Sequence, residues 1–199
     1  MLLTIRCAGL SGASSRYTPR KCVSKKNHHP NLHRPCAFAH LTCMTEAPAI
    51  DRRPIPEAAL NQLFHEAHTT SEWLAQPVPE RLLREIYNLT RLGPTSANTQ
   101  PARFVFVITE EAKARLLPAM SAGNQDKTRT APVTVLIAWD AEFYEHLPRT
   151  FPQANFRPLF AANKALAEET AFRNSSIEGG YFILAARALG LDCGPMSGW

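Results

Sequence analysis

Hydrophobic positions recur at helical spacing in several segments of the chain. The leucine and phenylalanine residues between positions 60 and 67 predict a helix that begins near Pro56, and a similar pattern over residues 82–89 predicts a second that begins near Pro79. Further helices are expected over residues 110–117, from about Glu142, and over residues 166–189, where Gly190 ends the longest of them. Gly179 and Gly180 within this long helix predict the close approach of another helix.

Two short apolar runs predict buried strands. Residues 104–108 and 133–139 are rich in β-branched and aromatic side chains, and a polar segment, residues 121–132, stands between them. The order helix, helix, strand, helix, strand, helix, helix indicates an α/β or α+β fold with helices on both faces of a sheet. Two strands make a thin sheet, so we expect another segment to complete it.

Charge and cysteine divide the chain near residue 43. Residues 1–43 hold seven Lys and Arg residues and no acid, whereas residues 44–199 carry 15 Lys and Arg residues against 17 Asp and Glu residues. Four of the five cysteines also lie before residue 44, which leaves Cys193 alone in the rest of the chain. A folded part with one cysteine is not a disulfide framework, and no apolar run reaches membrane-spanning length. We therefore expect a cytoplasmic protein.

Three interpretations of residues 1–43 remain open. The segment could be an organellar transit peptide, because it is basic and free of acids. It could bind zinc, although its cysteines and histidines fit no zinc-finger spacing. We favour a disordered leader that is dispensable for stability, followed by one domain over residues 44–199, since Met44 begins a stretch typical of a native N-terminus.

Several motifs of known chemistry are absent. The sequence has no G-x-G-x-x-G, no P-loop G-K-[ST] and no G-x-S-x-G nucleophile elbow. His65-Glu66-Ala67-His68 is one residue short of the H-E-x-x-H zinc motif, so we expect no metal there. The segment GPTSANTQP, residues 93–101, is more informative because it places many hydrogen-bonding groups between a helix and a buried strand. It is either a ligand-binding loop or a capped helix end with a polar turn.

Five stretches taken together resemble the nitroreductase family of flavoproteins. They are GPTSAN with PARFVFV, SAGNQDKTRTAPVTVLIAWD, EFYEHLPRTFP, ETAFRNSS and AARALGLDCGPMSGW, within residues 63–199. The most similar subgroup is the malonic semialdehyde reductases of pyrimidine degradation. The resemblance implies an α+β fold in α/β/α layers, with a central mixed sheet flanked by helices. Members of the family extend beyond the position of Trp199, which implies that the C-terminal strand is missing here.

The resemblance also implies a cofactor and its site. FMN would bind non-covalently at a homodimer interface, with both subunits lining each site, and NADH or NADPH would supply the hydride. No catalytic side chain is implied, because the flavin carries the chemistry. Lys127 would lie near the pyrimidine edge of the flavin, where an ammonium stabilises the reduced anion. The cofactor-binding residues implied are His68, Thr70, Pro94, Thr95, Ser96, Asn98, Gln100, Lys127, Pro195, Met196, Ser197 and Gly198.

One departure from the family concerns the flavin phosphate. His68 stands where the subgroup has an arginine that would bind it, and histidine lacks the bidentate fork of a guanidinium. We still expect an oxidoreductase that reduces 3-oxopropanoate to 3-hydroxypropanoate. The alternatives are a nitroaromatic or quinone reductase, or a non-catalytic binding protein that acts through its basic arm. We favour a small-molecule substrate over nucleic acid or membrane as the partner.

Overall fold

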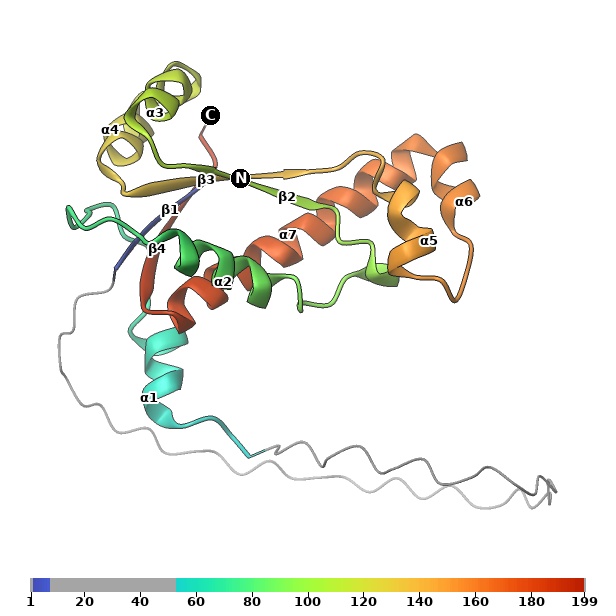
Figure 1. The fold of residues 1–199 in the computed structure, drawn as a ribbon, viewed down its shortest axis with the longest axis horizontal. Coiled ribbons are helices and arrows are strands. Elements are labelled where there is room, and N and C mark those ends of the chain that lie inside the picture. The colour runs from blue at the N-terminus through green and yellow to red at the C-terminus, as the bar shows by residue number, and fades with distance from the viewer. Residues whose placement is uncertain (1, 8–52, 199) are drawn as a thin grey trace. The chain divides into compact units, whose positions relative to one another are not determined.

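The computed structural model describes residues 2–7 and 53–198 of the chain (Figure 1). In these parts, one sheet and a long helix, α7, organise the other elements. The strands are β1 (Leu2–Cys7), β2 (Ala102–Val107), β3 (Val133–Trp139) and β4 (Leu191–Met196). The α-helices are α1 (Glu57–Leu60), α2 (Glu80–Thr90), α3 (Glu110–Leu116), α4 (Ala122–Thr130), α5 (Leu147–Thr150), α6 (Arg157–Ala162) and α7 (Lys164–Ala188). Shorter helical turns are η1 (Asn61–His65), η2 (Ser96–Asn98), η3 (Leu117–Ala119) and η4 (Phe143–His146).

The sheet has the strand order β2-β3-β1-β4, and all of its described pairs are antiparallel. The antiparallel pairing corrects the prediction of a mixed sheet. The strand order also identifies the segments that complete the sheet. Residues 191–196 are strand β4, and residues 2–7 form β1 between β3 and β4. The prediction that residues 1–43 lie wholly outside the folded part is therefore wrong for residues 2–7, while positions 8–52 fall outside the described residues.

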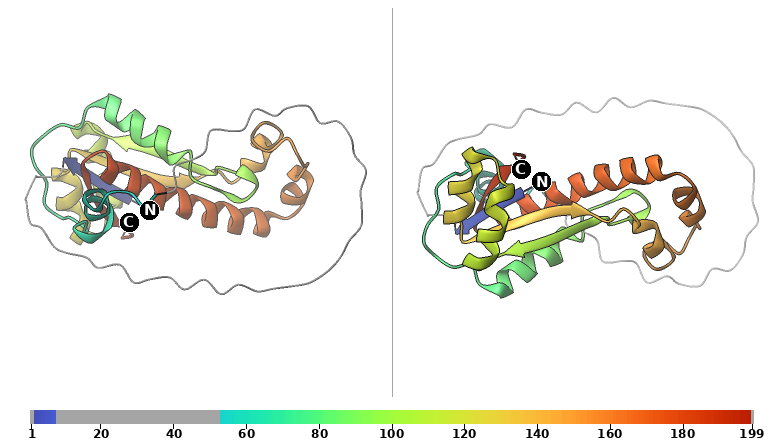
Figure 2. Two further views of the ribbon diagram at one scale, coloured as in Figure 1. Left: turned by 90° about the horizontal axis from the view of Figure 1, so that it is seen from below. Right: turned by 90° about the horizontal axis from the view of Figure 1, so that it is seen from above.

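The main core lies between the sheet and the helices α2 and α7. On β3, Val133, Val135 and Ile137 face this core, because alternate residues of a strand point to the same side. The opposite face of the sheet carries a smaller cluster, in which Leu136 and Met196 pack with Leu116 and Met120 from the α3–η3 segment. Helices therefore cover both faces, which confirms the predicted α/β/α layering (Figure 2).

The predicted helices and strands are found with small shifts in their ends. In α2, Leu83 and Ile86 are buried as the pattern predicted, and α7 ends at Ala188, two residues before Gly190, whose φ of 78° suits glycine. Residues 122–130 are a helix, α4, rather than an irregular polar segment. Gly180 does not meet a packed neighbour, because a Cβ built there would find nothing within 4 Å. The expected close helix approach is therefore absent at that glycine within the described part of the chain.

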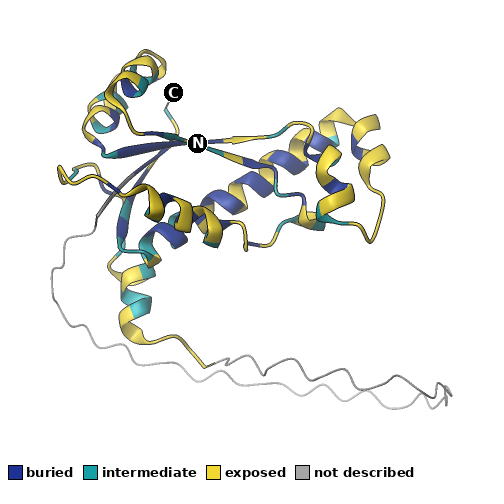
Figure 3. Cartoon of the chain, in the orientation of Figure 1, coloured by how far each residue is buried: buried dark blue, intermediate teal, exposed yellow. Residues whose placement is uncertain are grey.

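Burial differs sharply between the long helix and the segments at its N-terminal end. Much of α7 is buried, whereas α5 and α6 are mostly exposed (Figure 3). The α5–α6 segment has its own small cluster, formed around Phe143, Leu147 and Phe160. Among the described residues, no helix has both the length and the apolar character needed to cross a membrane.

Candidate functional site

The predicted site residues lie in two separate regions. We call residues 91–101 the α2–β2 loop. We call residues 68–73, 121–128 and 195–198, which lie around strand β4, the β4 region. The α2–β2 loop contacts the N-terminal half of α7, where the backbone N–H of Ser96 donates to Asn174 Oδ1 at 2.8 Å. Strand β4, around which the β4 region is built, follows the C-terminal end of α7 (Figures 1 and 2). From Asn174 to the last residue of α7, the helix rises about 20 Å at roughly 1.5 Å per residue.

Hydrogen bonds within the chain fix the α2–β2 loop. Asn98 donates its side-chain amide to the carbonyl of Thr150 at 2.7 Å, which ties the loop to α5. The backbone N–H of Gln100 donates to Thr95 Oγ1 at 3.2 Å, and its side-chain amide donates to Asn98 Oδ1 at 2.8 Å. The chain itself, rather than a ligand, therefore satisfies these polar groups. Pro94 and Ser96 remain exposed at the outer side of the loop.

The same loop holds an unusual backbone conformation. Ala97, Asn98 and Gln100 have positive φ angles of 47°, 48° and 40°. Residues other than glycine rarely adopt this region, and each such residue costs on the order of 1–3 kcal/mol. Strain of this kind concentrates at functional sites. The backbone conformation therefore favours a functional role for the α2–β2 loop, which the polarity of its residues alone did not indicate.

Hydrogen bonds also bring the parts of the β4 region together. The backbone N–H of Thr70 donates to the carbonyl of Cys193 at 3.1 Å, so that residues 68–70 lie beside β4. The carbonyl of Gly198 accepts from Ser121 Oγ at 3.0 Å and from Asn124 Nδ2 at 3.1 Å, which anchors the start of α4. A Cβ at Gly198 would lie 2.5 Å from Ser121 Oγ, so this contact requires glycine.

Individual side chains of the β4 region differ in exposure. Lys127 is half-buried and lies three residues after Asn124, on the same side of α4. Thr70 and Met196 are buried, while Pro195 and Ser197 are exposed. His68 is also exposed, and its Nδ1 lies 3.1 Å from the carbonyl of Glu66.

The β4 region also contains unmet hydrogen-bonding groups. The Nε1 of Trp73 and the hydroxyl of Thr128 are buried, and neither has a partner within the described part of the chain. Trp73 packs against β4, since its ring would lie 3.0 Å from a Cβ at Gly194. Buried polar groups are nearly always paired, so these two are available to a bound molecule.

Cys193, the cysteine of β4, is poorly suited to act as a nucleophile. Its burial raises the pKa of the thiol to about 12, so the thiolate does not form at neutral pH. The described residues contain no group of three or more His, Cys, Asp or Glu side chains that could bind a metal ion. The chemistry of this region is therefore that of hydrogen-bond donors and one lysine.

Sequence reasoning missed the side chains that support the α2–β2 loop from α7. Asn174 and Glu178 are buried, and each accepts a hydrogen bond from the backbone of the loop or of the strand that follows it. Their spacing was a usable signal, because Thr170, Asn174 and Glu178 repeat every four residues on one side of a helix. Polar residues at that spacing on an otherwise apolar helix side indicate buried side chains that form hydrogen bonds within the protein.

Sequence comparison relates this chain to one family of known proteins. The sequence model of the nitroreductase family matches residues 51–199. A protein of Burkholderia lata named "Putative NADH dehydrogenase/NAD(P)H nitroreductase" is 59% identical over 145 residues, which cover 73% of this chain and 74% of that protein. A protein of Ralstonia nicotianae with the same description is 54% identical over 142 residues, which cover 71% of this chain and 73% of that protein.

Comparison with solved structures also finds nitroreductases. A crystal structure described as a putative nitroreductase in complex with FMN, from Exiguobacterium sibiricum, superposes with a TM-score of 0.62. It is 20% identical, and the match covers 69% of this chain and 74% of that one. The family match spans the α2–β2 loop, the β4 region and the long helix between them, and the chain belongs to the nitroreductase family.

Proposed function

We propose that this protein is an FMN-dependent oxidoreductase that takes hydride from NADH or NADPH and passes it to a small acceptor. The observation that carries the proposal is the family match over residues 51–199. FMN, when bound, supplies the hydride-transfer chemistry, and the protein binds and orients the reactants. No acid–base pair of side chains is required.

The residues of the β4 region fit the chemistry of a flavin. The region offers hydroxyl, amide and indole donors, of which Trp73 Nε1 and the Thr128 hydroxyl are unpaired in the described structure. Lys127 supplies a positive charge, which would stabilise the anion of the reduced flavin at its pyrimidine edge. Thr70, Ser197 and Gly198 would hold the cofactor from the adjoining segments. His68 would lie near the phosphate, where it offers a weaker grip than arginine.

The separation of the two regions supports a homodimer. Within one chain the α2–β2 loop contacts the N-terminal half of α7, whereas β4 follows its C-terminal end, about 20 Å further along the helix. In a symmetric dimer, the α2–β2 loop of one chain would meet the β4 region of the other, so that Pro94, Ser96 and neighbouring residues complete each site. The apolar side chains of Phe172, Ile177 and Tyr181 along α7 are 58%, 41% and 39% exposed, as expected of a surface that a second copy covers.

For the acceptor, we propose 3-oxopropanoate, which would be reduced to 3-hydroxypropanoate. This rests on the resemblance of residues 93–107, 121–140, 142–152, 169–176 and 185–199 to the malonic semialdehyde reductases. The names of the two relatives favour a second candidate, a nitroaromatic acceptor. The two differ in charge, since 3-oxopropanoate is an anion and most nitroaromatics are neutral.

The test has two steps. The purified chain is first titrated with FMN while its visible absorbance and its sedimentation are followed, and we expect one FMN per subunit bound to a dimer. The loaded protein is then reduced with NADH or NADPH and mixed with 3-oxopropanoate, a nitroaromatic or a quinone, and reoxidation of the flavin is timed. Failure to bind FMN, together with binding of nucleic acid through residues 1–43, would contradict the proposal and support a binding protein.

A further inference from the structure

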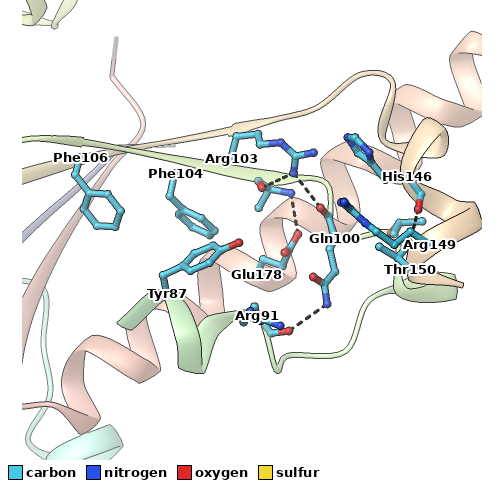
Figure 4. Close-up of a pocket in the computed structure, with 12 residues that line it drawn as sticks. Tyr87, Arg91, Gln100, Arg103, Phe104, Phe106, His146, Arg149, Thr150 and Glu178 are labelled. Atoms are coloured by element: carbon cyan, nitrogen blue, oxygen red, sulfur yellow. Dashed lines mark hydrogen bonds between the residues drawn. The ribbon is translucent and has the colours of Figure 1, made fainter. Parts of the chain in front are cut away.

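A cavity of about 430 Å³ lies on the inner side of the α2–β2 loop, among α2, β2, α5 and α7 (Figure 4). Tyr87, Phe104 and Phe106 line one end, and we call them the aromatic wall. Phe104 and Phe106 are half-buried, and Tyr87 is 46% exposed, so the wall offers apolar surface to a ligand. The volume falls within the range of small-molecule sites, roughly 300–1,000 Å³.

Two buried polar groups line the same cavity without full sets of partners. Thr99 is 2% exposed, and its hydroxyl has no hydrogen-bond partner in the described structure. Glu178 is 4% exposed and accepts the backbone N–H of Ala102 at 2.9 Å through Oε2. Its other oxygen remains available to a donor in the cavity. A molecule with a hydroxyl group would satisfy both, since a hydroxyl both donates and accepts.

The basic residues at the opposite end differ in how far they are neutralised. Arg103 is engaged, because it donates to Asp140 at 2.6 Å and to the carbonyl of Ala102 at 2.9 Å. His146 lies 3.4 Å from the same aspartate. Arg149 also lines the cavity but has no acidic partner in the described part of the chain, so it leaves a positive charge for an anion. Figure 4 shows Glu178 between the aromatic wall and this basic end.

We propose that this cavity is a second ligand site, on the inner side of the α2–β2 loop and separate from the β4 region, and that it takes an aromatic carboxylate with a hydroxyl group between its ring and its carboxylate. The ring lies along the aromatic wall, and the carboxylate pairs with Arg149. The hydroxyl donates to Glu178 and accepts from Thr99. Because Thr99 belongs to the α2–β2 loop, an occupied cavity also holds that loop in its strained conformation.

The test uses three probes on the full chain, measured by calorimetry with and without saturating FMN. 3-Phenyllactate carries every proposed group in the required order, 3-phenylpropanoate lacks the hydroxyl, and 1-phenylpropan-2-ol lacks the carboxylate. We expect 3-phenyllactate to bind about tenfold more tightly than either partial probe, since each lost polar contact costs about 1.4 kcal/mol. FMN should not displace it.

Variants separate the two polar contacts. Arg149→Gln should weaken binding of the two carboxylate probes about tenfold and leave 1-phenylpropan-2-ol unaffected, while Thr99→Val should weaken binding of only the two hydroxyl-bearing probes. Arg84→Gln is the matched control, because Arg84 is exposed on α2 and does not line the cavity. Absence of binding, equal affinity for all three probes, displacement by FMN, or an equal loss in Arg84→Gln would each overturn the proposal.

Discussion

Replacing Leu3 with alanine should lower the free energy of unfolding by about 3 kcal/mol. Leu3 is fully buried in the main core, in a strand whose neighbours are β3 on one side and β4 on the other. Truncating a buried leucine to alanine lowers the free energy of unfolding by about 2–5 kcal/mol, and the cost is smaller where neighbouring residues can move into the cavity. Because β1 is paired on both sides but short, its surroundings can relax in part, and we expect the middle of that range.

Urea unfolding followed by circular dichroism measures this cost. With a slope of roughly 2 kcal/mol per molar urea, the midpoint should fall by about 1.5 M. Leu92→Ala is the matched control, because Leu92 is 75% exposed and its truncation should change stability by less than about 0.5 kcal/mol. A chain that begins at Met44 lacks β1 entirely, and it should be less stable than Leu3→Ala. If both altered chains unfold at the same urea concentration as the unmodified one, the segment is dispensable and the placement of β1 is refuted.

Three further predictions concern the β4 region and the buried glutamate of α7. Lys127→Met should slow reduction of bound flavin by NADH in stopped-flow measurements more than it weakens FMN binding, and equal kinetics would show that Lys127 does not face the flavin. His68→Arg should tighten FMN binding about tenfold or more, because a charged hydrogen bond is worth roughly 1.5–3 kcal/mol; an unchanged titration would place His68 away from the phosphate. Burial raises the pKa of Glu178 above its ordinary value of 4.5, so its stabilising contribution is present below that pH and is lost as pH rises through the raised pKa. The melting temperature of the unmodified chain relative to Glu178→Gln should therefore fall as pH increases from about 4 to 7, and a constant difference would contradict this.

Local patterns predicted the elements that bury a continuous apolar face. Strand β3 was located from seven residues whose composition is typical of a buried strand, and α2 from apolar residues at helical spacing. In each case the residues that indicate the element also make its core contacts. The prediction and the packing therefore depend on the same side chains.

Helix α4 was missed because it has almost no apolar face. Its only buried residue is Thr128, and local contacts support it instead. Arg129 pairs with Asp126 one turn away, and the hydroxyl of Thr130 donates to the carbonyl of Asp126 at 2.8 Å. A pattern search for apolar periodicity cannot detect such a helix. The error matters for the site, because α4 rather than a loop positions Lys127.

Strand β1 was missed for a different reason. Its sequence, LLTIRC, is short, and the basic segment after it suggested a leader. Its place is set by long-range pairing, in which Leu3 lies opposite Val135 of β3 and Pro195 of β4. Those partners are more than 130 positions away, and no local pattern carries that information.

The polar side of α7 explains how the α2–β2 loop keeps a costly conformation. Asn174 accepts the backbone N–H of Ser96, and Glu178 accepts that of Ala102, where β2 begins. The two bonds lie on either side of the strained residues in the sequence. Both are made by α7, which is itself packed in the core. Each bond involves a buried side chain whose loss would leave an unpaired group, at a cost of about 1–3 kcal/mol. That is comparable with the strain at one of the positive-φ residues. The conformation that presents Pro94 and Ser96 at the surface is therefore set by α7, and the same helix fixes the distance between this loop and the β4 region.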